Sequence, residues 1–164
     1  MLLRLATLDD AAAIARIYNN EVEHSTATFD LRPRTLDEQR TWLVDRSGAH
    51  AVVVAVIEGE VAGFASLSPY RQRPAYNTTV ESSVYVSDRH RGLGVGDHLM
   101  AELCRCSDSH GFHTMIARIG DSNTASIELH RKHGFETVGI EREIGRKFGR
   151  WLDVNVMQRM ARPR

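Results

Sequence analysis

A strand, a short turn and a glycine-rich loop that opens a helix follow one another over residues 79–100. The predicted strand is Thr79–Val86, and the loop reads Arg91-Gly92-Leu93-Gly94-Val95-Gly96. Glycine at every second position removes the side chains that would keep a ligand away from the backbone. The N–H groups of the loop and of the first helical turn then form an anion site, which the helix dipole strengthens. We therefore expect a ligand that carries phosphate groups.

The spacing distinguishes this loop from two common nucleotide-binding loops. A P-loop needs Gly-Lys followed by Ser or Thr after its first glycines, and the chain has no such sequence here. A dinucleotide-binding loop reads G-x-G-x-x-G with an acidic residue about 20 positions further on, whereas this loop reads G-x-G-x-G. Taken alone, the glycines are also compatible with an ordinary tight turn before a helix.

The order Arg-x-x-Gly-x-Gly, one short turn after the strand end Val84-Tyr85-Val86, resembles the acetyl-coenzyme A signature of the GNAT superfamily of N-acetyltransferases. The segment from Asn123 to Gly134-Phe135 is similar to the second cofactor-contacting helix of that superfamily. Narrower marks resemble the phosphinothricin and methionine sulfoximine acetyltransferases, and the match runs in order from about Leu3 to Met160. These marks are Ser25-Thr26-Ala27-Thr28-Phe29, Arg73-Pro74-Ala75-Tyr76, Thr79-Val80-Glu81-Ser82 and Lys147-Phe148-Gly149-Arg150-Trp151-Leu152-Asp153-Val154.

Hydrophobic periodicity predicts an α/β chain that forms one domain over residues 1–164, with its core at about 3–160. Capping-box patterns at Thr7 and Thr35 predict two early helices. Two further helices are expected at 94–109 and 123–133. Strands are expected at 3–6, 51–57, 61–67, 79–86, 113–119, 136–143 and 151–160. The resemblance implies the GNAT fold, a mixed, mostly antiparallel central sheet flanked by helices.

Composition argues against several classes of function. The 21 Lys and Arg residues balance the 21 Asp and Glu residues, so general nucleic-acid binding is not expected. No apolar run approaches the ~20 residues of a membrane-spanning helix, so no membrane association is expected, and Met1–Ala6 is too short for a signal peptide. Cys104 and Cys106 point to different sides of a predicted helix, so we expect neither a disulfide nor a metal clip. A cytoplasmic protein with reduced thiols is predicted.

Glu81 is the candidate general base. Glutamate is depleted in strand interiors, yet Glu81 follows Val80 within a predicted strand. Partial burial would raise the pKa of its carboxyl toward the working range, and an amine must lose a proton before or during attack on a thioester. The strand from Glu81 to Val86 spans roughly 16 Å, about the reach of an extended pantetheine arm. A solvent-facing glutamate on an edge strand is the alternative, but the resemblance matches Glu81 to the base proposed for the phosphinothricin enzymes.

The resemblance also implies which residues contact acetyl-coenzyme A. The strand end would pair with the amides of pantetheine, and the backbone N–H of Val86 would polarise the thioester oxygen. The loop would hold the phosphates, with positive charge added by Arg89 and Arg91. Asn123 would contact the pantetheine arm, unless it is a plain helix N-cap. The full predicted set is Val84, Tyr85, Val86, Arg91, Gly92, Leu93, Gly94, Val95, Gly96, Asp97, Asn123, Ser126 and Lys132.

His130 is the second candidate for proton transfer. Many superfamily members carry Tyr at this position of Leu-Tyr-x-x-x-Gly-Phe, where it protonates the leaving thiolate, and this chain has His, as the phosphinothricin enzymes do. Imidazole can donate a proton near neutral pH. Alternatively, a chain of water molecules supplies the proton. His130 is then a histidine of the helix surface or of the core without a catalytic role. No metal is predicted, because the eight histidines form no recognisable ligand set and are expected to be solvated.

The resemblance implies an acceptor such as phosphinothricin or methionine sulfoximine, a small amine bound through its α-amino-acid end. Such ligands need cations near the acceptor pocket, and Arg71 and Arg73 precede the Glu81 strand. On spacing alone both arginines could be ordinary loop charges. The predicted acceptor-binding residues are Arg71, Gln72, Arg73, Pro74, Glu81, Ser82 and Ser83.

Other functions are compatible with the same sequence features. The acceptor could be a polyamine, a drug or a protein N-terminus, or the chain could be a regulatory module that binds coenzyme A without turnover. A homodimer is expected, by resemblance and because the last strands carry Trp151 and Val154 toward an end that no further chain covers.

Overall fold

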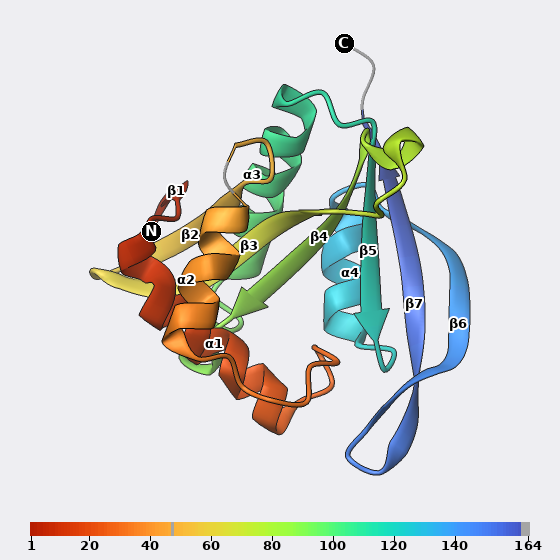
Figure 1. Cartoon of the computed structure of the whole chain (residues 1–164), viewed down its shortest axis with the longest axis horizontal. Helices are drawn as coiled ribbons and strands as arrows, with labels where there is room; N and C mark the ends of the chain where they lie inside the picture. Colours follow the sequence, from red (N-terminus) through yellow and green to blue (C-terminus); the bar gives the residue numbers. More distant parts are fainter. Residues whose placement is uncertain (47, 162–164) are drawn as a thin grey trace.

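The computed structural model describes residues 1–46 and 48–161. Within these ranges seven strands form one mixed sheet in the order β1-β2-β3-β4-β5-β7-β6 (Figure 1). The strands are β1 (Leu2–Leu5), β2 (Val52–Ile57), β3 (Glu60–Pro69), β4 (Thr79–Val86), β5 (Thr114–Gly120), β6 (Glu136–Lys147) and β7 (Arg150–Met160). The helices are α1 (Ala11–His24), α2 (Leu36–Asp45), α3 (Val95–Ser109) and α4 (Thr124–Lys132).

Local sequence signals explain where these elements begin and end. Thr35 accepts a hydrogen bond from the backbone N–H of Glu38, whose side chain bonds back to Thr35, and this capping box starts α2 as predicted. Glu58 and Gly59 take φ angles of 50° and 83°, the left-handed pair that a two-residue hairpin between β2 and β3 requires. The predicted strand over 79–86 is confirmed residue for residue.

Strand β6 is longer than predicted, because it continues through an irregularity to Lys147 instead of ending at Glu143. Its pairing with β7 shifts register between Glu141 and Gly145. Glu143 takes a φ angle of 50° there, and its backbone N–H donates to Asp153 Oδ1 at 2.8 Å. A bulge of this kind interrupts the alternation by which a strand is read from sequence.

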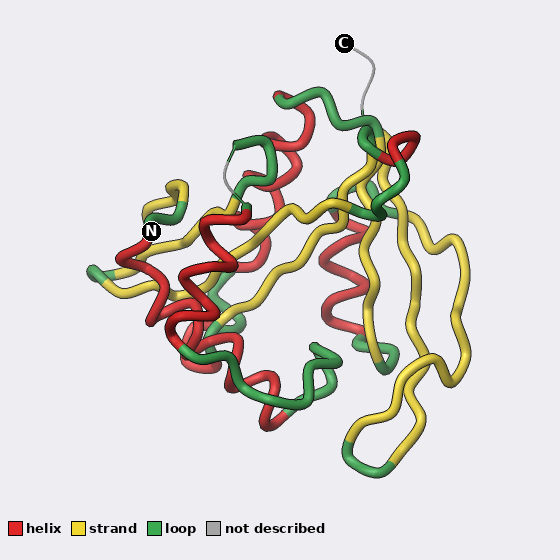
Figure 2. The backbone as a smooth tube through the Cα atoms, in the orientation of Figure 1, coloured by secondary structure: helices red, strands yellow, loops and turns green. Residues whose placement is uncertain are grey.

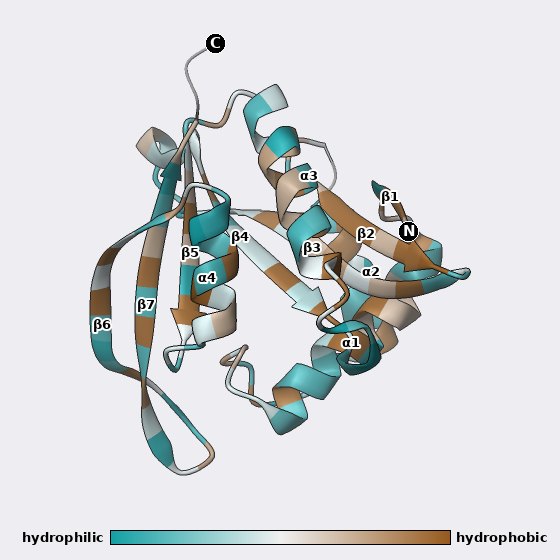
Figure 3. Ribbon diagram, turned by 180° about the vertical axis from the view of Figure 1, so that it is seen from behind, coloured by the Kyte–Doolittle hydropathy of each residue, from teal (hydrophilic) through white to brown (hydrophobic). Residues whose placement is uncertain are grey.

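Helices cover both faces of the sheet. On one face α1 and α2 pack over β2 and β3 around Phe64, and Tyr85 of β4 joins this cluster. On the other face α3 packs against the sheet through Leu99, Met100 and Leu103. Figure 2 shows α1 and α2 in front of the sheet with α3 and α4 behind it, and Figure 3 shows the apolar strand β2 between these layers.

The central feature of the sheet is the junction between β4 and β5, which is parallel while the other strand pairs are antiparallel. The two strands are paired only from Thr79 opposite Thr114 to Ser82 opposite Ala117. Beyond Ser82 they diverge, as Figure 1 shows. The second halves of both strands therefore leave a gap in the middle of the sheet.

None of the helices in the described ranges is long and apolar enough to cross a membrane.

Candidate active site

A cavity of about 510 Å³ opens where β4 and β5 diverge. This volume lies within the range of small-molecule sites. The ends of both strands, the loop before α3, the start of α4 and the end of α1 all contribute to it. Its lining residues are Glu21, Ser25, Thr26, Ala27, Ser82, Ser83, Val84, Tyr85, Val86, His90, Arg91, Gly92, Gly94, Val95, Gly96, Ala117, Arg118, Ile119, Gly120, Asn123, Ala125, Ser126, Leu129 and His130.

Strand β4 presents free backbone groups to this cavity. The backbone N–H of Ser87 donates to Ala62 O at 2.9 Å, so at this register the N–H groups of Ser87 and Tyr85 point toward β3. The alternation turns the N–H groups of Val84 and Val86 the other way, toward β5, which no longer pairs with β4 there. An extended ligand can therefore add to β4 as a short strand would.

The glycine-rich loop forms the other end of the cavity. Gly94 takes a φ angle of 79° as the N-cap of α3, a backbone conformation that L side chains rarely adopt. The helix then begins at Val95, and Gly96 in its first turn also lines the cavity. The helix N-terminus thus meets the diverging end of β4, where its dipole favours an anion.

The arginines of this region are paired with carboxylates of the chain itself. Arg91 forms ion pairs with the buried Glu21 and, at 3.0 Å, with Asp88. Arg89 is paired with Glu60 on the hairpin side and does not line the cavity. The expectation that both arginines add positive charge at the loop is therefore corrected: of the two, Arg91 lines the site and Arg89 does not, and a bound anion would share Arg91 with Glu21 and Asp88.

Glu81 lies on the face of the sheet that α1 and α2 cover, as the register with β3 places it on the side of Tyr85. Burial raises the pKa of its carboxyl, Arg118 opposes the shift, and Glu141 adds to it. A carboxyl with a raised pKa is a stronger base than an ordinary glutamate. Glu81 does not itself line the cavity, but its neighbours Ser82 and Ser83 do.

His130 lies on α4, on the opposite face, and it is buried with 4% of its surface exposed. The expectation of solvated histidines is wrong for this residue. Its Nδ1 lies 2.7 Å from Ser126 O, and a carbonyl oxygen can only accept, so Nδ1 carries the proton. The Nε2 atom is buried without a hydrogen-bond partner among the described residues. In the neutral ring this nitrogen is an acceptor, and burial lowers the pKa of His130, which favours the neutral ring.

Asn123 caps α4, because its Oδ1 accepts the backbone N–H of Ser126 at 3.1 Å. The N-cap alternative for this residue is confirmed. Asn123 also lines the cavity, and its Nδ2 makes no hydrogen bond to the described residues. The side-chain amide can therefore cap the helix with its oxygen and face a ligand with its nitrogen.

Comparison with known proteins identifies the family to which this chain belongs. The model of the Acetyltransferase (GNAT) family matches residues 13–135. The chain is 40% identical over 158 residues to the L-methionine sulfoximine/L-methionine sulfone acetyltransferase of Pseudomonas aeruginosa, covering 95% of this chain and 92% of that protein. It is 40% identical over 157 residues to the phosphinothricin N-acetyltransferase of Streptomyces viridochromogenes, covering 96% and 86%. The protein belongs to the GNAT family.

The predicted GNAT fold is confirmed by a solved structure of the same family. A phosphinothricin acetyltransferase of Sinorhizobium meliloti, crystallised in complex with acetyl-coenzyme A, superposes with a TM-score of 0.95 at 40% identity. The match covers 98% of this chain and 88% of that one. The central sheet, the diverging strands and the four helices are therefore those of a GNAT protein.

Three features of this GNAT chain fit acetyl-coenzyme A. The loop and helix N-terminus offer backbone N–H groups to phosphates, and Val84 and Val86 offer backbone groups to an extended amide chain. His130 lines the cavity, and its Nε2 is a buried polar atom without a hydrogen-bond partner among the described residues. Buried polar atoms without a partner are rare, which makes this nitrogen a candidate contact for a bound ligand or water molecule.

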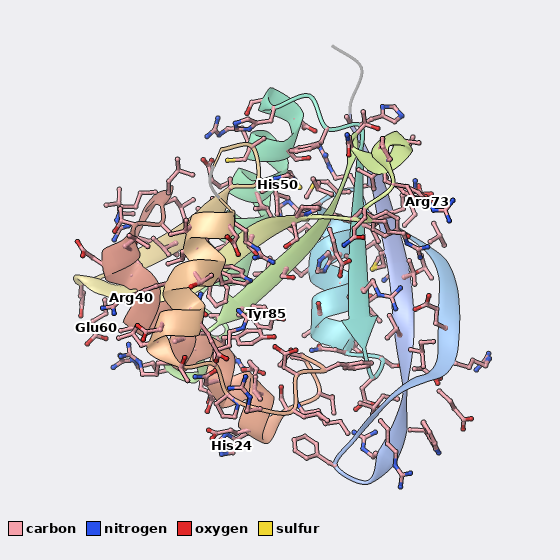
Figure 4. All side chains as sticks on the ribbon, in the orientation of Figure 1. His24, Arg40, His50, Glu60, Arg73 and Tyr85 are labelled. Carbon is pink, nitrogen blue, oxygen red and sulfur yellow. The ribbon has the colours of Figure 1, made fainter. Side chains whose placement is uncertain are left out.

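Several predicted site residues lie outside the cavity lining. Lys132 and Asp97 form an ion pair with each other at 2.9 Å, and Leu93 points to solvent. The segment of Arg71, Gln72, Arg73 and Pro74 is exposed next to a single 3-10 turn, and the Arg71 guanidinium lies over the rings of Tyr70 and Tyr76. Figure 4 shows Arg73 and Tyr85 at opposite ends of β4.

Sequence reasoning did not assign a role to the segment after α1. Ser25, Thr26 and Ala27 line the cavity from the α1 face, and Phe29 packs against the sheet, where a Cβ at Gly120 would come within 2.7 Å of its ring. Lys147 fastens the same segment by donating to Thr28 O at 2.8 Å. In the sequence this segment was noticed only as the motif Ser25–Phe29 that resembles the phosphinothricin enzymes. The spacing of its residues does not indicate a role in the site.

Proposed function

We propose that the protein transfers the acetyl group of acetyl-coenzyme A to the amino group of a small amino-acid-like acceptor such as phosphinothricin or methionine sulfoximine, by direct attack in a ternary complex. The observation that carries this proposal is the gap between β4 and β5. It lets one cavity reach the loop at one end and the surroundings of Glu81 and Arg118 at the other. The names of the 40%-identical relatives support the acceptor class.

Each element of the site then has one task. Bound acetyl-coenzyme A would supply the thioester, held by the loop and by the free edge of β4. The backbone N–H of Val86 would donate to the thioester oxygen, a preorganised donor for the charge that develops there. The raised pKa of Glu81 would let its carboxylate take a proton from the acceptor's ammonium, directly or through water.

The role of His130 depends on its tautomer. To protonate the leaving thiolate, Nε2 must carry a proton, and because Nδ1 already donates to Ser126 O this requires the doubly protonated ring. Burial disfavours that form. We therefore infer that at neutral pH Nε2 accepts a hydrogen bond, and that the proton for the thiolate comes from the reacting groups or from water.

Replacing His130 with phenylalanine is expected to lower kcat by about 10-fold, less than the loss for a residue that is itself the base. The buried ring also packs edge-on against Phe135 at 5.0 Å, a contact that phenylalanine keeps. Measuring kcat against pH separates the two roles. A donor role predicts that wild-type kcat falls as pH rises through the lowered pKa of His130, and an acceptor role predicts no such fall.

The acceptor is tested by a thiol-release assay over a panel of amines. We expect turnover of phosphinothricin or methionine sulfoximine at millimolar concentration and little turnover of a polyamine or of a peptide with a free N-terminus. If purified protein acetylates neither compound but turns over another amine, the acceptor class is wrong while acetyl transfer stands. If no amine releases thiol from acetyl-coenzyme A, acetyl transfer itself is contradicted and a regulatory module becomes the better account.

We propose further that the protein is a homodimer. Strands β6 and β7 expose several large apolar side chains, and Figure 3 shows hydrophobic bands along both. They are Val138, Ile140, Ile144, Trp151 and Met160. Val154 was expected to contribute as well, but it is buried with 4% of its surface exposed, on the face of the sheet that it shares with Gly120, where Phe29 packs.

The dimer is checked by sedimentation at micromolar concentration. We expect a species of twice the chain mass, and we expect Ile140→Lys to shift it toward monomer, because a charge would be placed in a desolvated contact. Glu136→Lys at the start of the same strand is the matched control, since Glu136 is a charged residue already. A wild-type protein that sediments only as monomer contradicts the proposal.

A further inference from the structure

Arg118 is a cation of the cavity lining that no sequence signal singled out. It follows Ala117, the last residue of β5 that pairs with β4, so its side chain leaves the sheet at the point where the strands diverge. It lies on the same face as Gly120 and as the Glu81 side of β4, under the segment after α1. Of the lysines and arginines in the described ranges, Arg91 and Arg118 line this cavity, one at each end.

The surroundings of Arg118 leave part of its guanidinium free. Its Nη2 donates to Glu141 of β6, and this hydrogen bond raises the pKa of Arg118. Its other N–H groups have no hydrogen-bond partner among the described residues. A guanidinium carries five donors in a planar fork, so Glu141 holds the fork in place and leaves donors for a second anion. About 29% of the side chain is exposed, which leaves it accessible from the cavity.

Glu81 lies close enough for Arg118 to lower the pKa of its carboxyl, yet the two side chains form no ion pair. The carboxyl of Glu81 and the guanidinium of Arg118 are therefore close to each other but not in direct contact. In an α-amino acid the amino group and the carboxylate are attached to the same carbon atom. A site that deprotonates the amine at Glu81 must then place the carboxylate close by, where the free donors of Arg118 are.

We propose that Arg118 binds the α-carboxylate of the acceptor and thereby makes the enzyme selective for α-amino acids over amines without an adjacent carboxylate. This inference rests on the proposed acetyl transfer to an amine. Arg91 is not suited to the same task, because it lies at the loop end and is already paired with Glu21 and Asp88. Arg71 and Arg73 lie outside the cavity, although Tyr70 beside them is near enough to affect the pKa of Arg118.

The test compares two acceptors that differ only at the carboxyl group, methionine sulfoximine and its carboxamide, in wild-type protein and in Arg118→Gln. Wild type is expected to prefer the carboxylate by roughly 10²-fold in kcat/KM, since a charge-assisted pair is lost with the amide. In Arg118→Gln we expect the preference to fall to a few-fold, while calorimetry shows an unchanged affinity for acetyl-coenzyme A. Arg118→Lys keeps the charge but not the fork and should fall between them.

Arg105→Gln is the matched control, because Arg105 is paired with Glu102 on the surface of α3, outside the cavity. It should leave the preference at its wild-type value. An Arg118→Gln protein that turns over both acceptors more slowly by the same factor overturns the inference, since Arg118 would then act through Glu81 or through the fold. Should that variant fail to fold, a wild type without preference for the carboxylate overturns it too. Absence of thiol release with every amine contradicts the proposed function instead.

Discussion

Replacing Glu81 with glutamine is expected to lower kcat by about 10²–10⁴-fold while leaving the affinity for acetyl-coenzyme A unchanged. Glutamine keeps the shape of the side chain but cannot accept a proton from the acceptor's ammonium. Glu81 lies on the α1 face of β4 and outside the lining of the cavity, so the cofactor's anchoring points on the loop are untouched. Stopped thiol-release assays give kcat, and calorimetry gives the affinity.

The pH profile provides a second measurement of the same role. Burial raises the pKa of Glu81 above the ordinary glutamate value, so kcat/KM should rise with pH through a limb that lies above that value. Glu81→Gln should remove the limb. Glu136→Gln, at an exposed carboxylate of β6, should leave both the rate and the limb unchanged. A loss of only a few-fold with an unaltered profile would make Glu81 a positioning residue.

We expect Glu81→Gln to lower the activity of the protein without lowering its free energy of unfolding. An acid whose pKa is raised on folding contributes stability below its unfolded pKa, and this contribution is lost as pH rises through the folded value. At neutral pH the ionised Glu81 is therefore a cost to the folded state. The glutamine variant is expected to have a free energy of unfolding at pH 7 that is equal to or higher than that of the wild type, which excludes misfolding as the reason for its inactivity.

The parts of the fold that the sequence predicted well are those with local signals. Alternation and the apolar run located β4, and the capping box located α2, because each depends on neighbours a few residues away. Most of the predicted cofactor residues line the cavity, and they belong to contiguous motifs: the loop, the strand end and the cap of α4. The bulge in β6 was not predicted, and the hydrogen bond that accompanies it is made to Asp153 on the partner strand.

The acceptor site that we propose at Arg118 could not be predicted from the sequence, because its geometry comes from residues far apart in the chain. Arg118 was not selected, whereas Arg71 and Arg73 were, since proximity in sequence to Glu81 was the only available guide. The parallel pairing of β4 with β5 brings Arg118 beside Glu81, and the bulged strand β6 brings Glu141 to Arg118. In the same way, Glu21 reaches Arg91 from α1 across 70 positions. Such pairs follow from topology and not from pattern.

The glycines of the loop are the second place where a large effect is expected. Replacing Gly96 with valine should weaken acetyl-coenzyme A binding by about 10²-fold, as judged from the loss of charge-assisted hydrogen bonds between phosphate and the backbone. A Cβ at Gly96 would lie 3.4 Å from Leu129 Cδ2 and 3.6 Å from Val86 Cγ2. These are ordinary contacts, so the fold accommodates the first carbon, while the branched methyl groups occupy the cavity lining.

A substitution at Gly94 would be harder to interpret than one at Gly96. Its φ angle of 79° is strained for any L side chain, so Gly94→Val would combine loss of binding with loss of stability. Gly139→Val is the matched control for Gly96, because Gly139 lies on β6 with no atom within 4 Å of an added Cβ and without a positive φ. Calorimetry on both folded variants decides the matter. Equal affinities in Gly96→Val and wild type would mean that the phosphates of the cofactor do not approach the start of α3. The proposal that this loop binds the phosphates would then be wrong.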